Sequence, residues 1–356
     1  MDITEMLSDL RRRDWETDSP DGTVRMAVIG LGGFAREYAL PGIAAGDYAE
    51  TTVLVSGSAE KAERLAEEWD AERGITYEEY HDGVAADDYD AVYIVTPNAL
   101  HLDFSQTAAD HGKHVICEKP LEATVDRAEK LVDVCAEADV KLMTAYRLQT
   151  EPLIRRVRDL VVGGHIGDPV TVHGEFSLRS LRGERTPDHW RYDPELSGGG
   201  AMLDDGVYPL NTSRFILGRD PVTVSGTTAT RNPVFSDVDE RVAFQLGFPD
   251  AIAGLCSATY DGQPRSFLEI TGVDGRVQLT DVFEPRATRT VTVETSEGRV
   301  SLQGPGVDEL TEQFDYFAYH ILTDGDIEPD GHDGLVDMRV GAAVYTSAET
   351  GDRISL

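Results

Sequence analysis

The chain has 356 residues and a formal net charge of -33, from 65 acidic against 32 basic residues. This balance excludes a protein that binds nucleic acid or an anionic membrane surface, because both surfaces need clustered lysine and arginine. The hydrophobic content of 40% excludes a disordered acidic chain.

The acidic residues are dispersed along the chain, and only five of the 32 basic residues are lysines. Acidic surfaces with arginine in place of lysine are typical of salt-adapted (halophilic) proteins, in which counterions screen the self-repulsion. No apolar run approaches membrane-spanning length, and the three cysteines are too scattered for a disulfide framework. We therefore expect a soluble, cytoplasmic protein.

Residues 1 to 24 form a polar arm with one short helical pattern at residues 3 to 15. From residue 25 to 148, apolar strands alternate with amphipathic helices. This alternation predicts an α/β domain, a Rossmann dinucleotide-binding domain with a parallel sheet covered on both faces. The expected strands read "RMAVIG", "TTVLVS", "AVYIVT", "KHVICE" and "KLMTAY", with a weaker candidate at "GITYEE".

Residues 149 to 356 are predicted to form an α+β domain with a large, mostly antiparallel β-sheet. Successive strand patterns are joined by turns such as "DG" and "GVDG", which favour antiparallel pairing. The expected strands are "DPVTVHGEFSL", "VTVSGTTAT", "ERVAFQLGF", "IAGLCSATY", "RSFLEITGV", "GRVQLT" and "TRTVTVETS". Two helical patterns close the chain, and the last, about residues 333 to 348, is expected to pack back on the first domain.

The first strand leads into a glycine pattern. "RMAVIGLGGFA" places Gly30, Gly32 and Ala35 in a G-x-G-x-x-A spacing between a strand and a helix. Glycine permits the tight turn and lets backbone N–H groups approach a pyrophosphate at the helix N-terminus. This context predicts a dinucleotide site.

The second strand ends in Ser56, Gly57 and Ser58, with Lys61 one turn into the next helix. A carboxylate at this position would favour NAD through the ribose hydroxyls, whereas hydroxyls and a cation suit the 2′-phosphate of NADP. The simpler alternative is that the serines cap a helix and Lys61 is a solvated surface charge. Arg36 is a second candidate cation.

Polar residues follow two further strands, at the edge where ligands bind in open α/β sheets. Thr96, Pro97, Asn98 and His101 follow one strand, and "EKP" at residues 118 to 120 follows the next. A lysine here can hydrogen-bond a substrate hydroxyl and lower the pKa of a neighbouring acid or base. The alternatives are that Lys119 only pairs with Glu118 and that His101 is an ordinary helix-start histidine. We expect Pro120 to begin a helix.

The segment "LSGGGAMLDDGVYPLN" contains the second polar group. Asp204 and Tyr208 are four apart, on one face of a predicted helix, whereas Asp205 falls on another face. Free tyrosine has a pKa of about 10, so a catalytic tyrosine needs a nearby cation, for which Lys119 is the candidate. The alternative is a core tyrosine hydrogen-bonded to an aspartate. "GGG" is interpreted as a flexible start to the helix.

Together, "GLGGFA", "TPNALH", "HGKHVICEKPLEAT" and "SGGGAMLDDGVY" resemble the glucose–fructose oxidoreductase, inositol dehydrogenase and rhizopine-catabolism oxidoreductase family, over about residues 24 to 350. The resemblance implies catalytic roles for Lys119, Asp204 and Tyr208. It implies substrate contacts by these three residues and Arg147. The implied cofactor contacts are Gly30, Leu31, Gly32, Gly33, Phe34, Ala35, Ser56, Gly57, Ser58, Lys61, Thr96, Pro97, Asn98, His101, Glu118, Lys119, Arg147, Trp190 and Arg191.

The resemblance also implies an activity, the NADP-dependent oxidation of an aldose at its anomeric carbon, with D-xylose the expected substrate. Two alternatives stay open: an oxidoreductase that retains its NADP and cycles between two sugars, and a non-catalytic NADP or sugar-binding regulator. We expect a homo-oligomer formed through the C-terminal sheet. No metal is expected, because His114 and Cys117 lie within an apparent strand and no second ligand pair is present.

Overall fold

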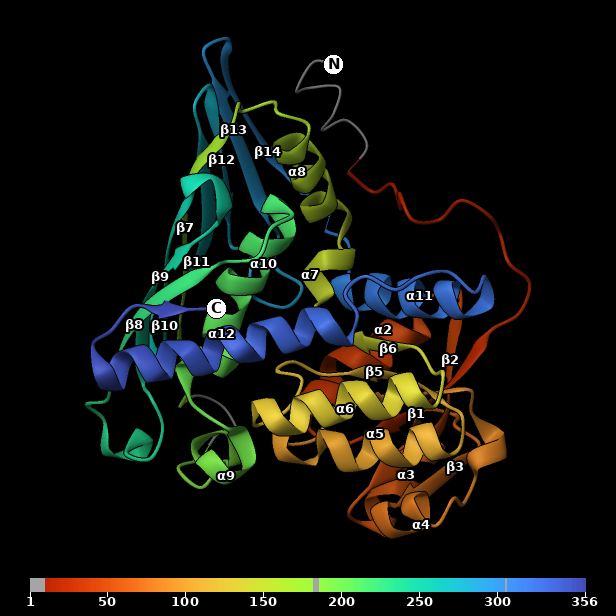
Figure 1. Ribbon diagram of the computed structural model, residues 1–356. Coiled ribbons are helices and arrows are strands. Elements are labelled where there is room, and N and C mark those ends of the chain that lie inside the picture. Colours follow the sequence, from red (N-terminus) through yellow and green to blue (C-terminus); the bar gives the residue numbers. More distant parts are fainter. Residues whose placement is uncertain (1–9, 182–185, 305) are drawn as a thin grey trace. The chain divides into compact units, whose positions relative to one another are not determined.

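The computed structural model of the protein describes residues 10 to 181, 186 to 304 and 306 to 356. They form two compact units (Figure 1), which are described separately. The parallel-sheet unit comprises Asp14–Thr150 and Asp308–Leu335. The large-sheet unit comprises Glu151–Val307 and Val336–Leu356, with the described part of the arm up to Arg13.

The parallel-sheet unit is built on six described strands in the order β3-β2-β1-β4-β5-β6, and each neighbouring pair is parallel. This is the strand order of a dinucleotide-binding Rossmann sheet. The strands are β1 (Val24–Ile29), β2 (Ala49–Ser56), β3 (Arg73–Thr76), β4 (Ala91–Ile94), β5 (His114–Cys117) and β6 (Leu142–Thr144). The weak strand pattern ends at Thr76, because Thr76 and Glu79 form a capping box that starts a helix.

Helices cover both faces of this sheet, as the alternating pattern predicted. The helices of this unit include a short π-helix, η1 (Ala35–Ala39), which continues into α2 (Leu40–Ala44), followed by α3 (Ala59–Glu68), α4 (Tyr77–His81), α5 (His101–Asp110), α6 (Val125–Glu137), α7 (Arg147–Thr150) and α11 (Glu309–Leu322).

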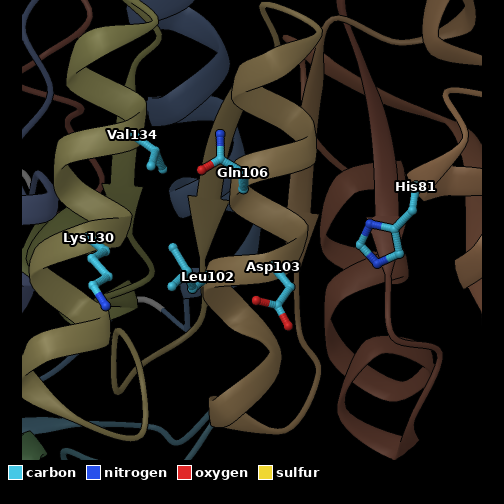
Figure 2. A pocket seen from close by; sticks show the side chains of 6 residues that line it. All are labelled: His81, Leu102, Asp103, Gln106, Lys130 and Val134. Atoms are coloured by element: carbon cyan, nitrogen blue, oxygen red, sulfur yellow. The ribbon is translucent and has the colours of Figure 1, made fainter.

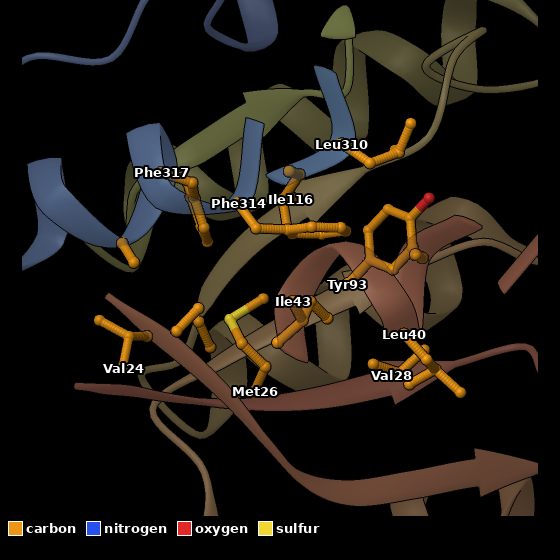
Figure 3. Close-up of a cluster of buried hydrophobic side chains, with 14 of the residues drawn as sticks. Val24, Met26, Val28, Leu40, Ile43, Tyr93, Ile116, Leu310, Phe314 and Phe317 are labelled. Carbon is orange, nitrogen blue, oxygen red and sulfur yellow. The ribbon is translucent and has the colours of Figure 1, made fainter. Parts of the chain in front are cut away.

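One face of the parallel sheet is buried beneath α2 and α11. Figure 3 shows Val24, Met26 and Val28 of β1 on the side of the sheet that also carries Phe314 and Phe317 of α11. Alternate residues of a strand share a face, so β1 presents these three side chains together. The apolar face of α11 explains why residues 308 to 335 belong with this unit. The predicted boundaries had left them in the second domain.

The large-sheet unit contains nine described strands in the order β14-β13-β12-β11-β7-β10-β9-β8-β15. Neighbouring strands are antiparallel except β7 and β10, which are parallel. Burial alternates along β9 and β10, so one face is buried and the other exposed. The strands are β7 (Pro169–Arg179), β8 (Thr223–Ala229), β9 (Arg241–Gly247), β10 (Ala253–Thr259), β11 (Asp261–Gly272), β12 (Gly275–Thr280), β13 (Thr290–Thr295), β14 (Gly298–Gln303) and β15 (Ile354–Ser355).

The principal helical segments of this unit are α8 (Pro152–Val162), α9 (Pro194–Ser197), the π-helix η5 (Met202–Gly206), α10 (Val207–Leu217) and most of the C-terminal α12 (Gly331–Thr350). Helices α8 and α10 pack side by side (Figure 1), and α10 lies against β7. Helix α12 is divided between the units: its residues up to Leu335 belong to the parallel-sheet unit, and those from Val336 onward belong to the large-sheet unit. The helical pattern predicted in the arm falls largely outside the described residues, and residues 10 to 23 contain turns but no helix.

Candidate active site

The glycine loop after β1 combines one sterically required glycine with one open position. Gly30 has φ +99°, and a Cβ there would lie 2.7 Å from the carbonyl oxygen of Val95. A Cβ on Gly32, which is exposed, would meet no described atom within 4 Å. The Leu31 and Ala35 side chains are buried. The loop therefore leaves room above its backbone, where a pyrophosphate fits, and Ala35 serves the packing of the helix on the sheet.

The end of β2 gathers hydroxyls and positive charge. Ser58 caps α3 by accepting a hydrogen bond from the Lys61 N–H at 3.3 Å, and Ser56 Oγ accepts one from the Ser58 N–H at 3.3 Å. Burial lowers the pKa of Lys61, and the charges of Arg36 and Arg64 lower it further. Two further cations, Arg36 and Arg64, thus act on Lys61 at this edge. The helix-cap interpretation is correct for Ser58, and the residues also fit a 2′-phosphate.

The loop after β4 is held in place by a buried histidine. The His101 ring is fully buried, with Nε2 3.1 Å from the Thr96 carbonyl oxygen and Nδ1 3.2 Å from that of Leu121. Direct contact of His101 with a cofactor is therefore wrong, because none of its surface is accessible. It positions the loops that carry Thr96 and Lys119. The buried Thr96 Oγ1 has no hydrogen-bond partner among the described residues.

Glu118 and Lys119 follow the end of β5 rather than lying within it. Glu118 accepts hydrogen bonds from Tyr93 Oη at 2.7 Å and from the Lys119 backbone N–H at 3.2 Å. Burial raises the pKa of Glu118, while the charge of Lys119 and the Tyr93 hydrogen bond act in the opposite direction. Pro120 does not begin a helix, because α6 starts at Val125. The "EKP" residues therefore form a loop at the carboxyl edge of the sheet.

Arg147 was predicted to contact cofactor and substrate, and the structure places it in the interior instead. Its side chain is 4% exposed, and Nη1 lies 3.6 Å from Oε1 of the fully buried Glu309. Removing either partner would leave the other as an unpaired buried charge, which would destabilise the fold. Arg147 therefore joins α7 to the start of α11, and this buried position does not agree with the predicted contact to cofactor and substrate.

In the large-sheet unit, Arg191 links two of the predicted site residues. Its Nε lies 3.0 Å from Oδ2 of Asp204, and its guanidinium carbon lies 4.4 Å from the centre of the Trp190 ring. Tyr260 donates a hydrogen bond to the same Asp204 oxygen at 3.3 Å. Burial raises the pKa of Tyr260 well above its usual value, and the Asp204 charge adds to this effect. The site thus holds a carboxylate between a cation and a neutral phenol.

The helix that carries Asp204 and Tyr208 begins with the π-helical segment η5 and continues as α10. Asp204 and Tyr208 are partly exposed, whereas Asp205 between them is buried. The Tyr208 ring packs edge-on against Phe176 at 5.4 Å between ring centres and lies 5.9 Å from Phe283. These aromatic contacts restrict the directions in which the phenol can point.

Several of these contacts were not predicted from the sequence. Tyr93, Glu309 and Tyr260 each touch a predicted site residue but belong to no recognised motif. Tyr260 follows β10, 56 residues after Asp204, and the packing of η5 against β10 brings the two together. A tyrosine at the end of the predicted strand "IAGLCSATY" was the one available signal.

A groove elsewhere on the parallel-sheet unit contains none of the predicted site residues. His81, Leu102, Asp103, Gln106, Lys130 and Val134 line it (Figure 2). Among the described residues, no group of three or more His, Cys, Asp or Glu side chains could hold a metal ion. No helix among the described residues is long and apolar enough to cross a membrane.

Two family profiles match the chain. One, described as the oxidoreductase family with an NAD-binding Rossmann fold, matches residues 24 to 146. The other, the GFO/IDH/MocA C-terminal domain, matches residues 154 to 278. The two matched segments together span most of both units.

Similar proteins cover the whole chain. It is 46% identical to a D-xylose 1-dehydrogenase [NADP(+)] of Haloarcula marismortui, covering 100% of both chains. It is 31% identical to a D-xylose 1-dehydrogenase (NADP(+)) 2 of Haloferax volcanii, over 92% of this chain and 98% of the relative. The crystal structure of an aldose-aldose oxidoreductase from Caulobacter crescentus matches with a TM-score of 0.88 at 29% identity, over 94% and 100% of the two chains. The protein belongs to the GFO/IDH/MocA oxidoreductase family.

Proposed function

We propose that the protein is an NADP-dependent sugar dehydrogenase that oxidises an aldose at its anomeric carbon to the lactone, with D-xylose as the substrate. The observation that carries this proposal is the 46% identity over the full length of both chains to a D-xylose 1-dehydrogenase. The second relative with the same name adds to it. The motif residues Lys119, Asp204 and Tyr208 are all present in the chain.

NADP fits the carboxyl edge of the parallel sheet. The open position above Gly32 accommodates a pyrophosphate, and the cations Arg36 and Lys61 suit a 2′-phosphate. Trp190 and Arg191, which the family resemblance also assigned to the cofactor, are proposed to contribute from the large-sheet unit.

The bound cofactor supplies the hydride acceptor for the anomeric carbon. We assign the proton chemistry to Tyr208, which as the phenolate takes the proton of the anomeric hydroxyl as the C–O bond becomes a carbonyl. Lys119 donates a hydrogen bond to that hydroxyl oxygen. Asp204 orients the pair, and Arg191 and Tyr260 hold its carboxylate.

A second candidate is an oxidoreductase that keeps its NADP and uses one sugar to reduce another. The similarity to an aldose-aldose oxidoreductase favours this candidate. Purified protein that shows the absorbance of reduced nicotinamide after sugar addition, with no free cofactor, would support it.

Three further proposals accompany the function. The exposed face of the large sheet, which includes Leu255 at 49% exposure, suits a homo-oligomer. The net charge of -33 suits a protein that works in concentrated salt. The three cysteines are free and buried, which suits a cytoplasmic location.

Initial rates with several pentoses and hexoses, measured with NADP and with NAD in high salt, test the function. We expect the highest kcat/KM for D-xylose with NADP, and formation of the lactone. Absence of NADP reduction with every sugar would reject the proposal and favour a non-catalytic binding protein.

A further inference from the structure

The start of the helix that carries Asp204 is held by a carboxylate from a distant part of the chain. Asp239 Oδ1 accepts a hydrogen bond from the Gly200 N–H at 2.7 Å, and its Oδ2 accepts one from the Met202 N–H at 2.8 Å. The Asp239 carbonyl oxygen accepts a third, from the Ala201 N–H at 2.8 Å. Ala201, the local N-cap, makes no side-chain cap bond of its own. Asp239 therefore caps the helix in its place.

The glycines of "GGG" fit this arrangement. A Cβ on Gly200 would lie 2.1 Å from the Asp239 carbonyl oxygen, and one on Gly199 would lie 2.2 Å from Tyr345 Oη. Tyr345 itself donates a hydrogen bond to Asp239 Oδ1 at 2.8 Å. The segment is thus closely packed rather than a flexible start to the helix, because Gly200 lets the Asp239 backbone approach and Gly199 leaves room for the Tyr345 side chain.

Residues 239 and 240 also hold Tyr260, the hydrogen-bond partner of Asp204. The carbonyl oxygen of Glu240, the residue after Asp239, accepts a hydrogen bond from the Tyr260 N–H at 2.9 Å. Tyr260 in turn donates its hydroxyl to Asp204. Asp239 therefore holds the helix that carries Asp204, and Glu240 holds the backbone of Tyr260. Together they position both partners of the Asp204–Tyr260 hydrogen bond.

We propose that Asp239 is a positioning residue for the reaction, because it fixes the helix that presents Asp204 and Tyr208. The inference rests on the proposed function, which supplies its kinetic readout. A carboxylate accepts hydrogen bonds through both oxygens, and its negative charge lies at the positive end of the helix. Asparagine keeps one acceptor and replaces the other with a donor, so Asp239→Asn loses one backbone N–H bond with little change in shape.

The test compares full-length Asp239→Asn with Asp237→Asn, which makes the same charge change at an exposed neighbour. We expect kcat for Asp239→Asn to fall about tenfold to a hundredfold, since small misplacements near the chemistry have effects of this size. The KM for NADP should stay unchanged, as should kcat for Asp237→Asn. Amide hydrogen exchange at residues 200 to 202 should become faster in Asp239→Asn alone.

Wild-type kcat in Asp239→Asn, or unchanged exchange at residues 200 to 202, would overturn the proposal. If wild type reduces no NADP with any sugar, the proposed function fails, and the exchange result alone decides whether Asp239 caps the helix. Should Asp239→Asn not fold, Tyr345→Phe removes only one hydrogen bond to the same carboxylate. Its kcat should fall about threefold to tenfold with exchange at these amides increased, and no change in either would overturn the proposal.

Discussion

Arg191 holds the Asp204 carboxylate at 3.0 Å while its guanidinium lies over the Trp190 ring. The side chains of Arg191 and Asp204 are 24% and 15% exposed, so water screens this pair less than a surface ion pair. The guanidinium can bind the carboxylate and stack on an indole at the same time, which an ammonium group cannot do with the same geometry.

Replacement of Arg191 should therefore weaken catalysis. Leaving a largely buried carboxylate without its partner costs about 1–3 kcal/mol, so we expect kcat/KM of Arg191→Ala to fall about tenfold to a hundredfold. Arg191→Lys should retain part of the activity, because it keeps the charge. Steady-state kinetics with D-xylose measure this effect, and Arg179→Ala in the exposed part of β7 is the matched control. Equal activity in all four proteins would contradict the role.

Lys61 should set the preference for NADP over NAD. A charge-assisted hydrogen bond contributes about 1.5–3 kcal/mol, so Lys61→Ala should raise the KM for NADP about tenfold to a hundredfold. The KM for NAD should hardly change, because NAD has no 2′-phosphate. Lys130→Ala, in the groove of Figure 2, removes the same charge away from the predicted cofactor residues. If the ratio of the KM values for NADP and NAD stays the same in Lys61→Ala, Lys61 does not set the cofactor preference.

The two glycines of the nucleotide loop should respond differently to alanine. Gly30→Ala places a Cβ against the Val95 carbonyl at a positive φ, so the folded state should lose about 1–3 kcal/mol and the Tm should fall. Gly32→Ala meets no described atom within 4 Å, so its Tm should match that of wild type while NADP binding weakens. Thermal melts and cofactor titrations give both quantities. Normal NADP binding by Gly32→Ala would contradict the site.

His101 should make stability depend on pH. Burial lowers its pKa, so the fold disfavours the protonated ring. The stability from neutral His101 is complete above the unfolded pKa of about 6.5 and is lost as pH falls through the lower folded pKa. The free energy of unfolding, measured from pH 7 downward in constant salt, should fall less steeply in His101→Gln than in wild type. Identical pH slopes in His101→Gln and wild type would count against this role.

The local parts of the fold were predictable from the sequence because they depend on short-range patterns. Gly30 follows an apolar strand, and the strand order around β1 agrees with the expected dinucleotide-binding sheet. The alternation of strands with amphipathic helices agrees with the structure for the same reason, since the periodicity and the caps of helices such as α3 and α6 are local. The assignment of α11 to the parallel-sheet unit was not predictable, because its pattern shows an apolar face but not the partner that covers it.

The missed parts of the site depend on contacts between distant residues. The family resemblance assigned Arg147 to the site, but Arg147 is paired with Glu309, and Asp204 is held by Tyr260. The "GGG" segment suggested flexibility, whereas Asp239 and Tyr345 pack against it. In each case the deciding partner lies more than 35 residues away along the chain, and no local pattern reports its position.

The most direct measurement of the central claim is the turnover of Lys119→Ala with D-xylose and NADP, combined with its Kd for NADPH. The account predicts that kcat falls about a hundredfold or more while NADPH binds as tightly as in wild type, because the lysine acts on the sugar hydroxyl. Lys113→Ala, six residues earlier, should retain full turnover as the control. A Lys119→Ala protein that oxidises D-xylose at the wild-type rate would contradict the account.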